Sequence, residues 1–537
     1  MRENMESNKI WNSDLRDGTY RNPILYADYS DPDVIRVGED YFMTASSFCN
    51  VPGLPILHSK DLVNWKLVNY VIDEIPEERY EKPMHGCGVW APSIRYHEGV
   101  YYVCFPMPDE GIYMSTTTDP FGTWSKPVNI RPGAGWIDPC PFWDDDGRAY
   151  LVAGVAKSRI GYKSVLHMIE MQPDGMGLIS QEQKIFDGNE NDQVTIEGPK
   201  LYKRNGWYYI FAPAGGVKTG WQTVLRSRKV FGPYEYKVVM RQGGSTVNGP
   251  HQGAWVDTVT GEDWFIHFQD VYAAGRITHL QPMVWKEDWP VIGVAAEGAD
   301  YGEPVMKYKK PNVGSIHWEI CEPPTSDDFT EKKLGLQWQW NSNPKKGWYE
   351  LTGSDLRLHA VQKTDVYGDM PNLLLSKWPA PEFTCITKLD LSQLTDQDEA
   401  GVISMGMSYG VLTFKKEGTN LHPYYIYGEQ KYGKILPETT QETVTALPMI
   451  NETQVYVRYT VLRTGTRDIS ATEKGFPLEC VLIEYSIDGS SYIKAGEMEA
   501  IPGRWVGVKN GPFCASSKAG SNGYVTVNYV QYESKKH

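Results

Sequence analysis

The chain has 537 residues, which is too long for one compact core and indicates two or more domains. Its formal net charge is −14 and its lysines and arginines are not clustered, so the sequence lacks the basic surface that nucleic acids and acidic membranes require. The 34 tyrosines, 18 tryptophans and 51 glycines favour strands, tight turns and surfaces on which sugars stack.

The N-terminal 18 residues are polar, and no segment has the apolar run of a signal peptide or a membrane span. The sequence as written therefore predicts a cytoplasmic protein, or a periplasmic or secreted one if a signal peptide has been removed. The eight cysteines form no Cys-x-x-Cys pair. We expect buried or free thiols, and neither a metal site nor a disulfide framework.

A turn followed by an aromatic-led strand recurs five times in the first 270 residues. The period is about 50 to 60 residues, which is typical of propellers. Five units predict an all-β domain over residues 20–315, a five-bladed β-propeller. The repeated segments are "GEDYFMTAS" (38–46), "HEGVYYVCF" (97–105), "DDGRAYLVAG" (145–154), "NGWYYIFAP" (205–213) and "GEDWFIHFQ" (261–269).

Prolines and lysines interrupt this pattern over residues 304–329, as a linker would. Short alternating segments such as "EFTCITKLDLS" and "TQVYVRYTVLR" follow at high density. This pattern is typical of a β-sandwich. We therefore expect a second all-β domain, a sandwich, over residues 324–537.

Three carboxylates share a local pattern near the start of a blade's first strand. Asp31 lies in "YSDPDVI", Asp138 in "GWIDPCPFW" and Glu197 in "VTIEGPKLY", each followed by proline or glycine. The innermost strands of a propeller line its central channel, so one acid from each of three blades can converge on one point. Each motif taken alone is also compatible with an ordinary turn.

These segments, with "GVWAPSIRY", "NGPHQGAWV" and "GRITHLQPMVW" in the same order, resemble glycoside hydrolase family 43, the β-xylosidases and α-L-arabinofuranosidases built on a five-bladed propeller. "SDDFTEKKLGLQWQWNSNP" resembles the start of the concanavalin-like sandwich appended to many members. The resemblance implies Asp31 as general base, Glu197 as general acid, and Asp138 as the residue that tunes the acid's pKa and orients it. Asp28 and Asp33 match no catalytic position and are expected to be structural.

The resemblance also implies residues around this trio. Arg276 resembles an arginine that binds sugar hydroxyls, although a surface ion pair would explain it too. Phe48 and Trp90 resemble aromatic walls of the terminal sugar subsite, with core packing as the alternative. His85 lies just before "GCGVWAP" and is a candidate for the same pocket, or for a packing or hydrogen-bonding role.

His251 resembles the histidine near the propeller axis that is the one protein ligand of a largely hydrated calcium in many members. Calcium prefers oxygen ligands, so a neutral imidazole that fills the channel is the alternative. No organic cofactor is expected.

The expected function is exo-acting, inverting hydrolysis that releases a terminal pentose, β-D-xylose, from xylo-oligosaccharides or arabinoxylan fragments. An α-L-arabinofuranosidase or a bifunctional enzyme stays open, because the two sugars place similar atoms at the cleaved bond. A non-catalytic carbohydrate-binding propeller would not need three converging acids. The invertase group has a Glu-Cys-Pro motif where this chain has Glu-Gly-Pro.

Overall fold

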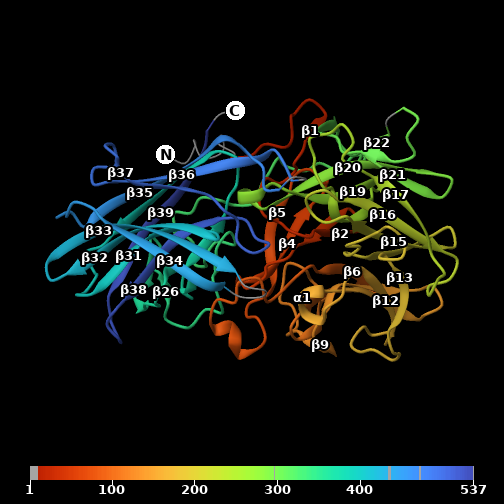
Figure 1. Ribbon diagram of the computed structural model, residues 1–537, viewed down its shortest axis with the longest axis horizontal. Coiled ribbons are helices and arrows are strands. Elements are labelled where there is room, and N and C mark those ends of the chain that lie inside the picture. The colour runs from red at the N-terminus through yellow and green to blue at the C-terminus, as the bar shows by residue number, and fades with distance from the viewer. Residues whose placement is uncertain (1–9, 296, 433–436, 471–472, 536–537) are drawn as a thin grey trace.

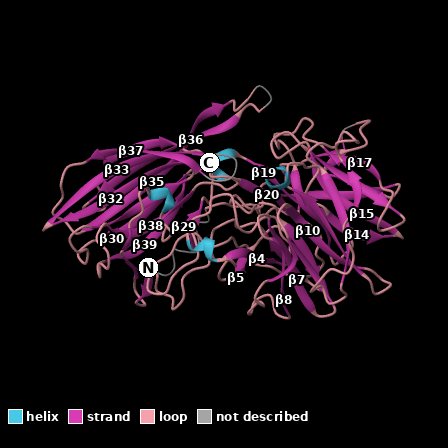
Figure 2. Ribbon diagram, turned by 60° about the horizontal axis from the view of Figure 1, so that its bottom comes forward, coloured by secondary structure: helices cyan, strands magenta, loops and turns pink. Residues whose placement is uncertain are grey.

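The computed structural model describes residues 10–295, 297–432, 437–470 and 473–535. The chain forms two lobes of strands, with the N-terminal lobe coloured red to green and the C-terminal lobe cyan to blue (Figure 1). Helix is confined to α1 (Lys157–Ile160) and three short 3-10 turns in the described residues (Figure 2). The prediction of an all-β chain is confirmed.

The N-terminal lobe is a five-bladed propeller, as predicted. Each blade is an antiparallel sheet whose strands follow one another in sequence order. The blades are β2 (Asp33–Val37), β3 (Asp40–Thr44), β4 (Gly53–Ser59) and β5 (Lys66–Ile72); β6 (Ser93–His97), β7 (Val100–Met107), β8 (Gly111–Thr117) and β9 (Val128–Pro132); β10 (Trp136–Trp143), β11 (Ala149–Val155), β12 (Val165–Met171) and β13 (Gln183–Asp187); β14 (Lys200–Arg204), β15 (Trp207–Ala214), β16 (Trp221–Ser227) and β17 (Glu235–Met240); and β18 (His251–Asp257), β19 (Asp263–Asp270), β20 (Arg276–Lys286) and β21 (Trp289–Ile292).

Hydrophobic clusters between neighbouring blades hold the propeller together. The middle strands carry apolar side chains on both faces, so one strand contributes to the clusters on its two sides. Five clusters join the five blades in a closed ring. Representative members are Phe42 with Val103, Cys104 with Leu151, Val152 with Ile210, Phe211 with Phe265, and Ile266 with Tyr41.

The two ends of the propeller segment meet beside the last blade. β1 (Thr19–Arg21) pairs with β24 (Lys307–Lys309), and β22 (Val294–Ala295) and β23 (Gly302–Glu303) extend the fourth blade. Asn22 Nδ2 donates to Leu280 O at 2.7 Å, which anchors the entering chain on β20. The ring is thus closed by side-chain packing and by these end contacts.

The C-terminal lobe is a β-sandwich, also as predicted. Burial alternates along β30 (Phe383–Asp390), with Phe383, Cys385 and Leu389 pointing inward, so one face of its sheet meets the core. One sheet holds β25 (Gln339–Trp340), β29 (Leu374–Lys377), β38 (Lys509–Ser516), β31 (Asp398–Met405), β32 (Ser408–Glu417), β33 (Asn420–Tyr432) and β34 (Pro437–Ala446), with β28 (Val361–Gln362) beside β38; the other holds β26 (Tyr349–Leu351), β27 (Leu356–His359), β39 (Tyr524–Ser534), β30 (Phe383–Asp390), β35 (Gln454–Arg467), β36 (Phe476–Ser486) and β37 (Ile493–Glu499).

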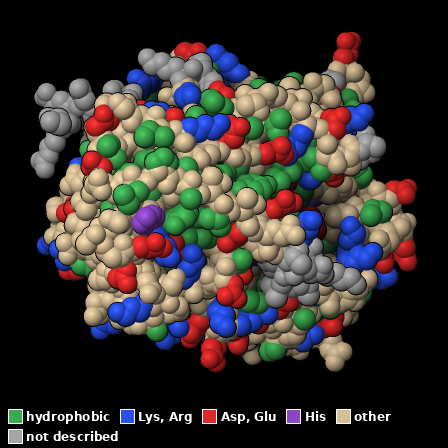
Figure 3. All heavy atoms as spheres, turned by 60° about the vertical axis from the view of Figure 1, so that its left-hand side comes forward, with side chains coloured by type: hydrophobic (Ala, Val, Ile, Leu, Met, Phe, Trp, Pro, Cys, Tyr) green, Lys and Arg blue, Asp and Glu red, His purple; other side chains and the backbone are tan. Residues whose placement is uncertain are grey.

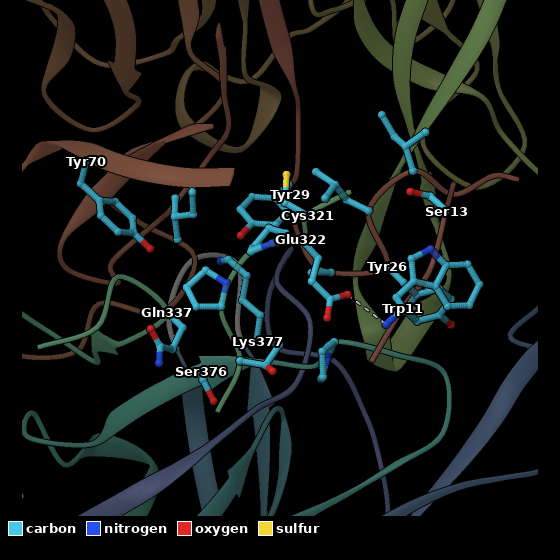
Figure 4. A pocket seen from close by; sticks show the side chains of 18 residues that line it. Trp11, Ser13, Tyr26, Tyr29, Tyr70, Cys321, Glu322, Gln337, Ser376 and Lys377 are labelled. Atoms are coloured by element: carbon cyan, nitrogen blue, oxygen red, sulfur yellow. Dashed lines mark hydrogen bonds between the residues drawn. The ribbon is translucent and has the colours of Figure 1, made fainter. Parts of the chain in front are cut away.

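The two lobes share a polar and hydrogen-bonded seam. Val51 and Trp340 form an isolated bridge, and Lys509 Nζ donates to Asn50 Oδ1 at 2.7 Å. A small cavity of about 50 Å³ lies along the seam, where Trp11 N donates to Glu322 Oε2 at 3.1 Å (Figure 4). The sandwich therefore packs directly against the propeller, and the linker is not the only connection between the two lobes.

The surface fits the charge pattern of the sequence. On the sandwich-side face, acidic and basic side chains are interspersed and do not gather into one basic patch (Figure 3). No helix in the described ranges has the length and apolarity that crossing a bilayer would require.

Candidate active site

A cavity of about 240 Å³ lies at one end of the propeller channel, where the five innermost strands begin. Asp31, Asp138 and Glu197 all line it, so the structure brings the three predicted carboxylates together. They precede β2, lie within β10 and precede β14, respectively. Phe48, Trp90 and Arg276 also line the cavity.

Asp31 is buried and held by three donors. Its Oδ2 accepts Ser30 Oγ at 2.8 Å and Ser46 Oγ at 2.6 Å, and its Oδ1 accepts Arg276 Nη1 at 3.0 Å. Its φ is 56°, a left-handed conformation that aspartate tolerates better than most residues. Several donors, one of them a cation, suit an ionised carboxylate that accepts a proton.

Arg276 begins β20 and is itself buried. Burial alone would lower the pKa of its guanidinium, but the nearby Asp31, Asp270 and Asp28 raise it. The side chain also lies over the ring of Phe268 at 4.8 Å. Arg276 is therefore a buried cation held beside Asp31. It is not part of a surface ion pair, which was the alternative explanation.

A bulge turns Asp138 into the cavity. The pairing of β10 with β11 shifts between Ile137 and Cys140, and Asp138 has a φ of 54°. Burial, followed by the charges of Glu197 and Asp31, raises the pKa of Asp138 to about 7. Ionisation of Asp138 is therefore disfavoured by its burial and by the neighbouring carboxylates.

Glu197 faces the cavity and is oriented from two sides. His251 Nε2 lies 2.9 Å from Glu197 Oε1, and the glutamate side chain is 26% exposed. Asp138 Oδ2 accepts the backbone N–H of Gly198 at 2.8 Å, which ties the glutamate's backbone to the third blade. Gly198 has a φ of 59°, and a Cβ there would lie 2.8 Å from the side chain of Gln252, so this turn needs glycine.

Three aromatic side chains form one wall of the cavity. Phe48 and Trp90 have ring centroids 6.1 Å apart, and Trp505 lies 4.6 Å from Trp90 and 6.4 Å from Phe48. Arg159 stacks on Trp90 at 4.9 Å. Trp505 comes from the sandwich, so both lobes build the cavity.

Sequence reasoning missed Trp505 and Gln252. Gln252 Nε2 donates to Asp138 Oδ1 at 3.2 Å. Trp505 lies in the segment "GRWVG", where a tryptophan between glycines was the available signal. Lys163 and Thr195, at the mouth, were also missed, and Lys163 Nζ donates to Thr195 Oγ1 at 2.7 Å.

His85 does not line this cavity. It borders a separate cavity of about 30 Å³ with Cys49, and its Nε2 lies 3.0 Å from the carbonyl oxygen of Gly368 in the sandwich. Burial, the largest single effect, lowers the pKa of His85, but the Cys49 side chain, the Gly368 carbonyl and the Asp369 charge together raise this pKa by more, so the net shift is upward. His85 was expected either in the pocket or in a packing or hydrogen-bonding role, and in the structure it forms hydrogen bonds at the seam between the lobes.

Asp28 and Asp33 both make structural contacts. Asp28 binds backbone N–H groups of Arg276 and Gly507. Asp33 Oδ2 accepts Arg95 Nη1 at 2.6 Å, deeper in the channel than Asp31.

His251 is the residue on which the calcium expectation depends. Its Nδ1 is buried with no hydrogen-bond partner, so one nitrogen is free to accept a bond. Among the described residues, no group of three or more His, Cys, Asp and Glu side chains is placed to hold a metal ion. Calcium takes roughly six to eight oxygen ligands, and a single imidazole does not fit that requirement. Calcium stays a prediction, and no step below depends on it.

Two family models match the chain. The model described as glycosyl hydrolases family 43 matches residues 20–290. The model described as the β-xylosidase C-terminal concanavalin A-like domain matches residues 326–533. Together they cover both lobes.

Individual proteins are similar over most of the chain. A Xylanibacter ruminicola protein, provisionally named β-xylosidase, is 38% identical over 94% of this chain and 87% of its own. A non-reducing end α-L-arabinofuranosidase of Bacteroides ovatus is 30% identical over 73% of this chain and 75% of its own. The solved structure of a bifunctional GH43-CE protein of Bacteroides eggerthii has a TM-score of 0.79 at 29% identity, and the match covers 96% of this chain and 64% of that longer one.

Proposed function

Because the chain belongs to glycosyl hydrolases family 43 and is a glycoside hydrolase, we propose that it releases single β-D-xylose units from the non-reducing ends of xylo-oligosaccharides or arabinoxylan fragments, with inversion. The observation that carries this proposal is the convergence of Asp31, Asp138 and Glu197 in one aromatic-walled cavity. Its volume of about 240 Å³ is below the roughly 300–1,000 Å³ of common ligand pockets. A site of this size suits one terminal sugar.

Asp31 is the general base in this proposal. Arg276, Ser30 and Ser46 hold its carboxylate, so it is positioned to take a proton from a water on one side of the sugar. The water then attacks the anomeric carbon. This role needs a gap between Asp31 and the sugar, as inverting enzymes have.

Glu197 is the general acid. It is the more exposed partner of the Asp138–Glu197 pair and faces the cavity, so it donates the proton to the leaving oxygen. Asp138 acts through Glu197 as a positioning residue, because it binds the N–H of the next residue and lies close enough for the two charges to repel. His251 fixes the other side of the glutamate.

The aromatic wall binds the sugar's apolar face. Phe48, Trp90 and Trp505 present ring surface beside the acids, and such surfaces suit the C–H face of a sugar ring. Since Trp505 comes from the sandwich, the proposal assigns that lobe a direct part in substrate binding.

The second candidate is α-L-arabinofuranosidase activity, which the name of the Bacteroides ovatus relative supports. A small change in contacts of about 1–3 kcal/mol is enough to shift the preference. The test is kcat/KM on the nitrophenyl glycosides of β-D-xylose, α-L-arabinofuranose, β-D-galactose and β-D-fructofuranose. We expect the xyloside to be the best substrate. A higher kcat/KM on the arabinofuranoside would favour the second candidate, and turnover of the fructofuranoside alone would refute both.

A further inference from the structure

The propeller channel has a second cavity at its other end. The five innermost strands run in one direction, and the candidate active site lies where they begin. A cavity of about 470 Å³ is lined further along the same strands by residues 34–36, 95–97, 142–143, 201–203 and 255–257. Each strand thus contributes to a cavity near each of its ends.

Buried polar side chains separate the two cavities. Arg95 Nη1 donates to Asp33 Oδ2 at 2.6 Å, and Arg95 Nη2 lies 2.9 Å from Cys140 Sγ. Lys200, also buried, donates to Pro92 O and to Ser93 Oγ at 2.7 Å each. Ile35 lies in β2, four residues after Asp31, which precedes this strand, so the chain spans at most roughly 13 Å between them. The second cavity is therefore a site of its own.

Aromatic side chains in this cavity are held in fixed orientations. The rings of Trp143 and His97 are stacked, with centroids 5.0 Å apart and planes 12° from parallel. Trp143 Nε1 donates to Pro173 O at 2.7 Å, and Trp255 Nε1 donates to Asp263 Oδ1 at 2.7 Å. Tyr96 is 44% exposed. His97 covers one face of the Trp143 ring, and this ring also contacts Tyr102, with centroids 4.5 Å apart. Because both indole N–H groups are already satisfied, the part of the cavity wall left to a ligand is fixed aromatic surface that costs little entropy to order.

The charges in the cavity are paired. Arg36 makes a two-point contact with Asp257, at 3.0 Å from Nε and 2.6 Å from Nη2. Arg95 pairs with Asp33. Lys203 contacts both Asp144 and Asp145, so each of the three lysine and arginine side chains that line the cavity has an acidic partner. An anionic ligand would need an unpaired cation, so a neutral ligand with many hydroxyls and an apolar face fits this site better.

We propose that this cavity is a second carbohydrate-binding site, which holds a neutral oligosaccharide segment by stacking on Trp143 and Tyr96 and by hydrogen bonds to the Arg36–Asp257 pair. The choice of a xylan-type segment rests on the proposed function. The site lies on the face of the propeller away from the reacting carboxylates, so it retains the enzyme on polymer and does not position the cleaved bond.

The test compares Trp143→Ala and Tyr96→Ala with the parent chain in affinity electrophoresis through gels containing soluble xylan. All of these proteins, and the Phe121→Ala control, carry Asp31→Asn, so that no xylan is hydrolysed during the run. Phe121→Ala is the matched control, because Phe121 is a 53% exposed aromatic that lines neither channel cavity. We expect Trp143→Ala and Tyr96→Ala each to weaken retention about tenfold, and Phe121→Ala to leave it unchanged.

The same substitutions in the active chain should leave kcat/KM on nitrophenyl β-D-xyloside unchanged, which shows that the variants fold. Retention equal to the parent's in both Trp143→Ala and Tyr96→Ala would overturn the proposal, as would equal loss in Phe121→Ala. If no nitrophenyl glycoside is cleaved but retention depends on Trp143, the second site stands and the proposed function fails. If the xyloside is cleaved and retention does not depend on Trp143 or Tyr96, the proposed function stands and the second site is refuted.

Discussion

The carboxylate of Asp28 accepts the backbone N–H of Gly507 at 2.8 Å, although 479 positions separate the two residues. Its other oxygen accepts the N–H of Arg276 at 3.0 Å. One buried side chain thus links the sandwich loop that carries Trp505 to the strand that carries the arginine beside Asp31. The sandwich contributes to the active site through this contact.

Asp28→Ala should disturb both sides of the cavity while the reacting carboxylates stay in place. Each buried hydrogen bond to a charged group is worth about 1.5–3 kcal/mol, and two N–H groups lose their acceptor. We expect KM on nitrophenyl β-D-xyloside to rise about tenfold and the melting temperature to fall. Asp73→Ala, at an exposed aspartate, is the control. A melting temperature and KM both equal to the parent's would show that Asp28 does not hold the loop.

Trp505→Ala should weaken substrate binding. Losing the burial of an aromatic side chain costs about 1.5–3 kcal/mol, which corresponds to a rise in KM of about tenfold to a hundredfold. Trp505→Phe should restore part of this loss. Trp318→Ala, which changes a tryptophan outside both channel cavities, should leave KM unchanged. A KM equal to the parent's in Trp505→Ala would show that the sandwich takes no part in substrate binding.

Glu197→Ala and Asp31→Ala should be distinguishable by the leaving group. A general acid contributes about 10²–10⁴-fold in rate only when the leaving group needs a proton. Glu197→Ala should therefore lose much more activity on xylobiose than on dinitrophenyl β-D-xyloside, whereas Asp31→Ala should lose activity on both alike. Equal losses on the two substrates in Glu197→Ala would argue against its role as the acid.

Asp138→Asn should separate stability from activity. The pKa of Asp138 is raised to about 7 from an ordinary value of 3.8, so the folded protein binds this proton more tightly than the unfolded chain does. Stability from this group is full below about pH 4 and is lost as the pH rises through about 7. Asparagine stays neutral at every pH, so the Asp138→Asn variant does not lose this stability as the pH rises.

At pH 8 the variant should therefore be more stable than the parent, by about 4 kcal/mol, and at pH 4 the difference should be small. Urea unfolding of both proteins at the two pH values measures this. kcat/KM should fall strongly in the same variant. A variant that is less stable than the parent at pH 8 would contradict a buried, charge-repelled carboxylate.

Local repeats made the propeller predictable. The turn and second strand of each blade repeat in the sequence, so the positions of Asp31, Asp138 and Glu197 ahead of these repeats were sufficient to place them at one end of the channel. The bulge at Asp138 and the left-handed backbone of Asp31 and Asp138 were not visible in the sequence. These depend on how the neighbouring strands pair.

Contacts between the lobes could not be predicted. Trp505 reaches the cavity only because the sandwich docks on the propeller, and no periodicity encodes that docking. His85 was misleading for the same reason. It is five residues from Trp90 in sequence, yet its ring turns toward Gly368 of the sandwich. Asp33, which was expected to be structural, pairs with Arg95.

The stereochemistry of hydrolysis tests the central claim most directly. In the proposed arrangement a water lies between Asp31 and the anomeric carbon, which corresponds to a carboxyl separation of roughly 6.5–9.5 Å and prevents a covalent glycosyl intermediate. Proton NMR during hydrolysis of a β-xyloside should show α-D-xylose first, before mutarotation produces the β-anomer. Initial β-D-xylose, or transfer of xylose to added methanol, would contradict the role of Asp31 as a base that activates water.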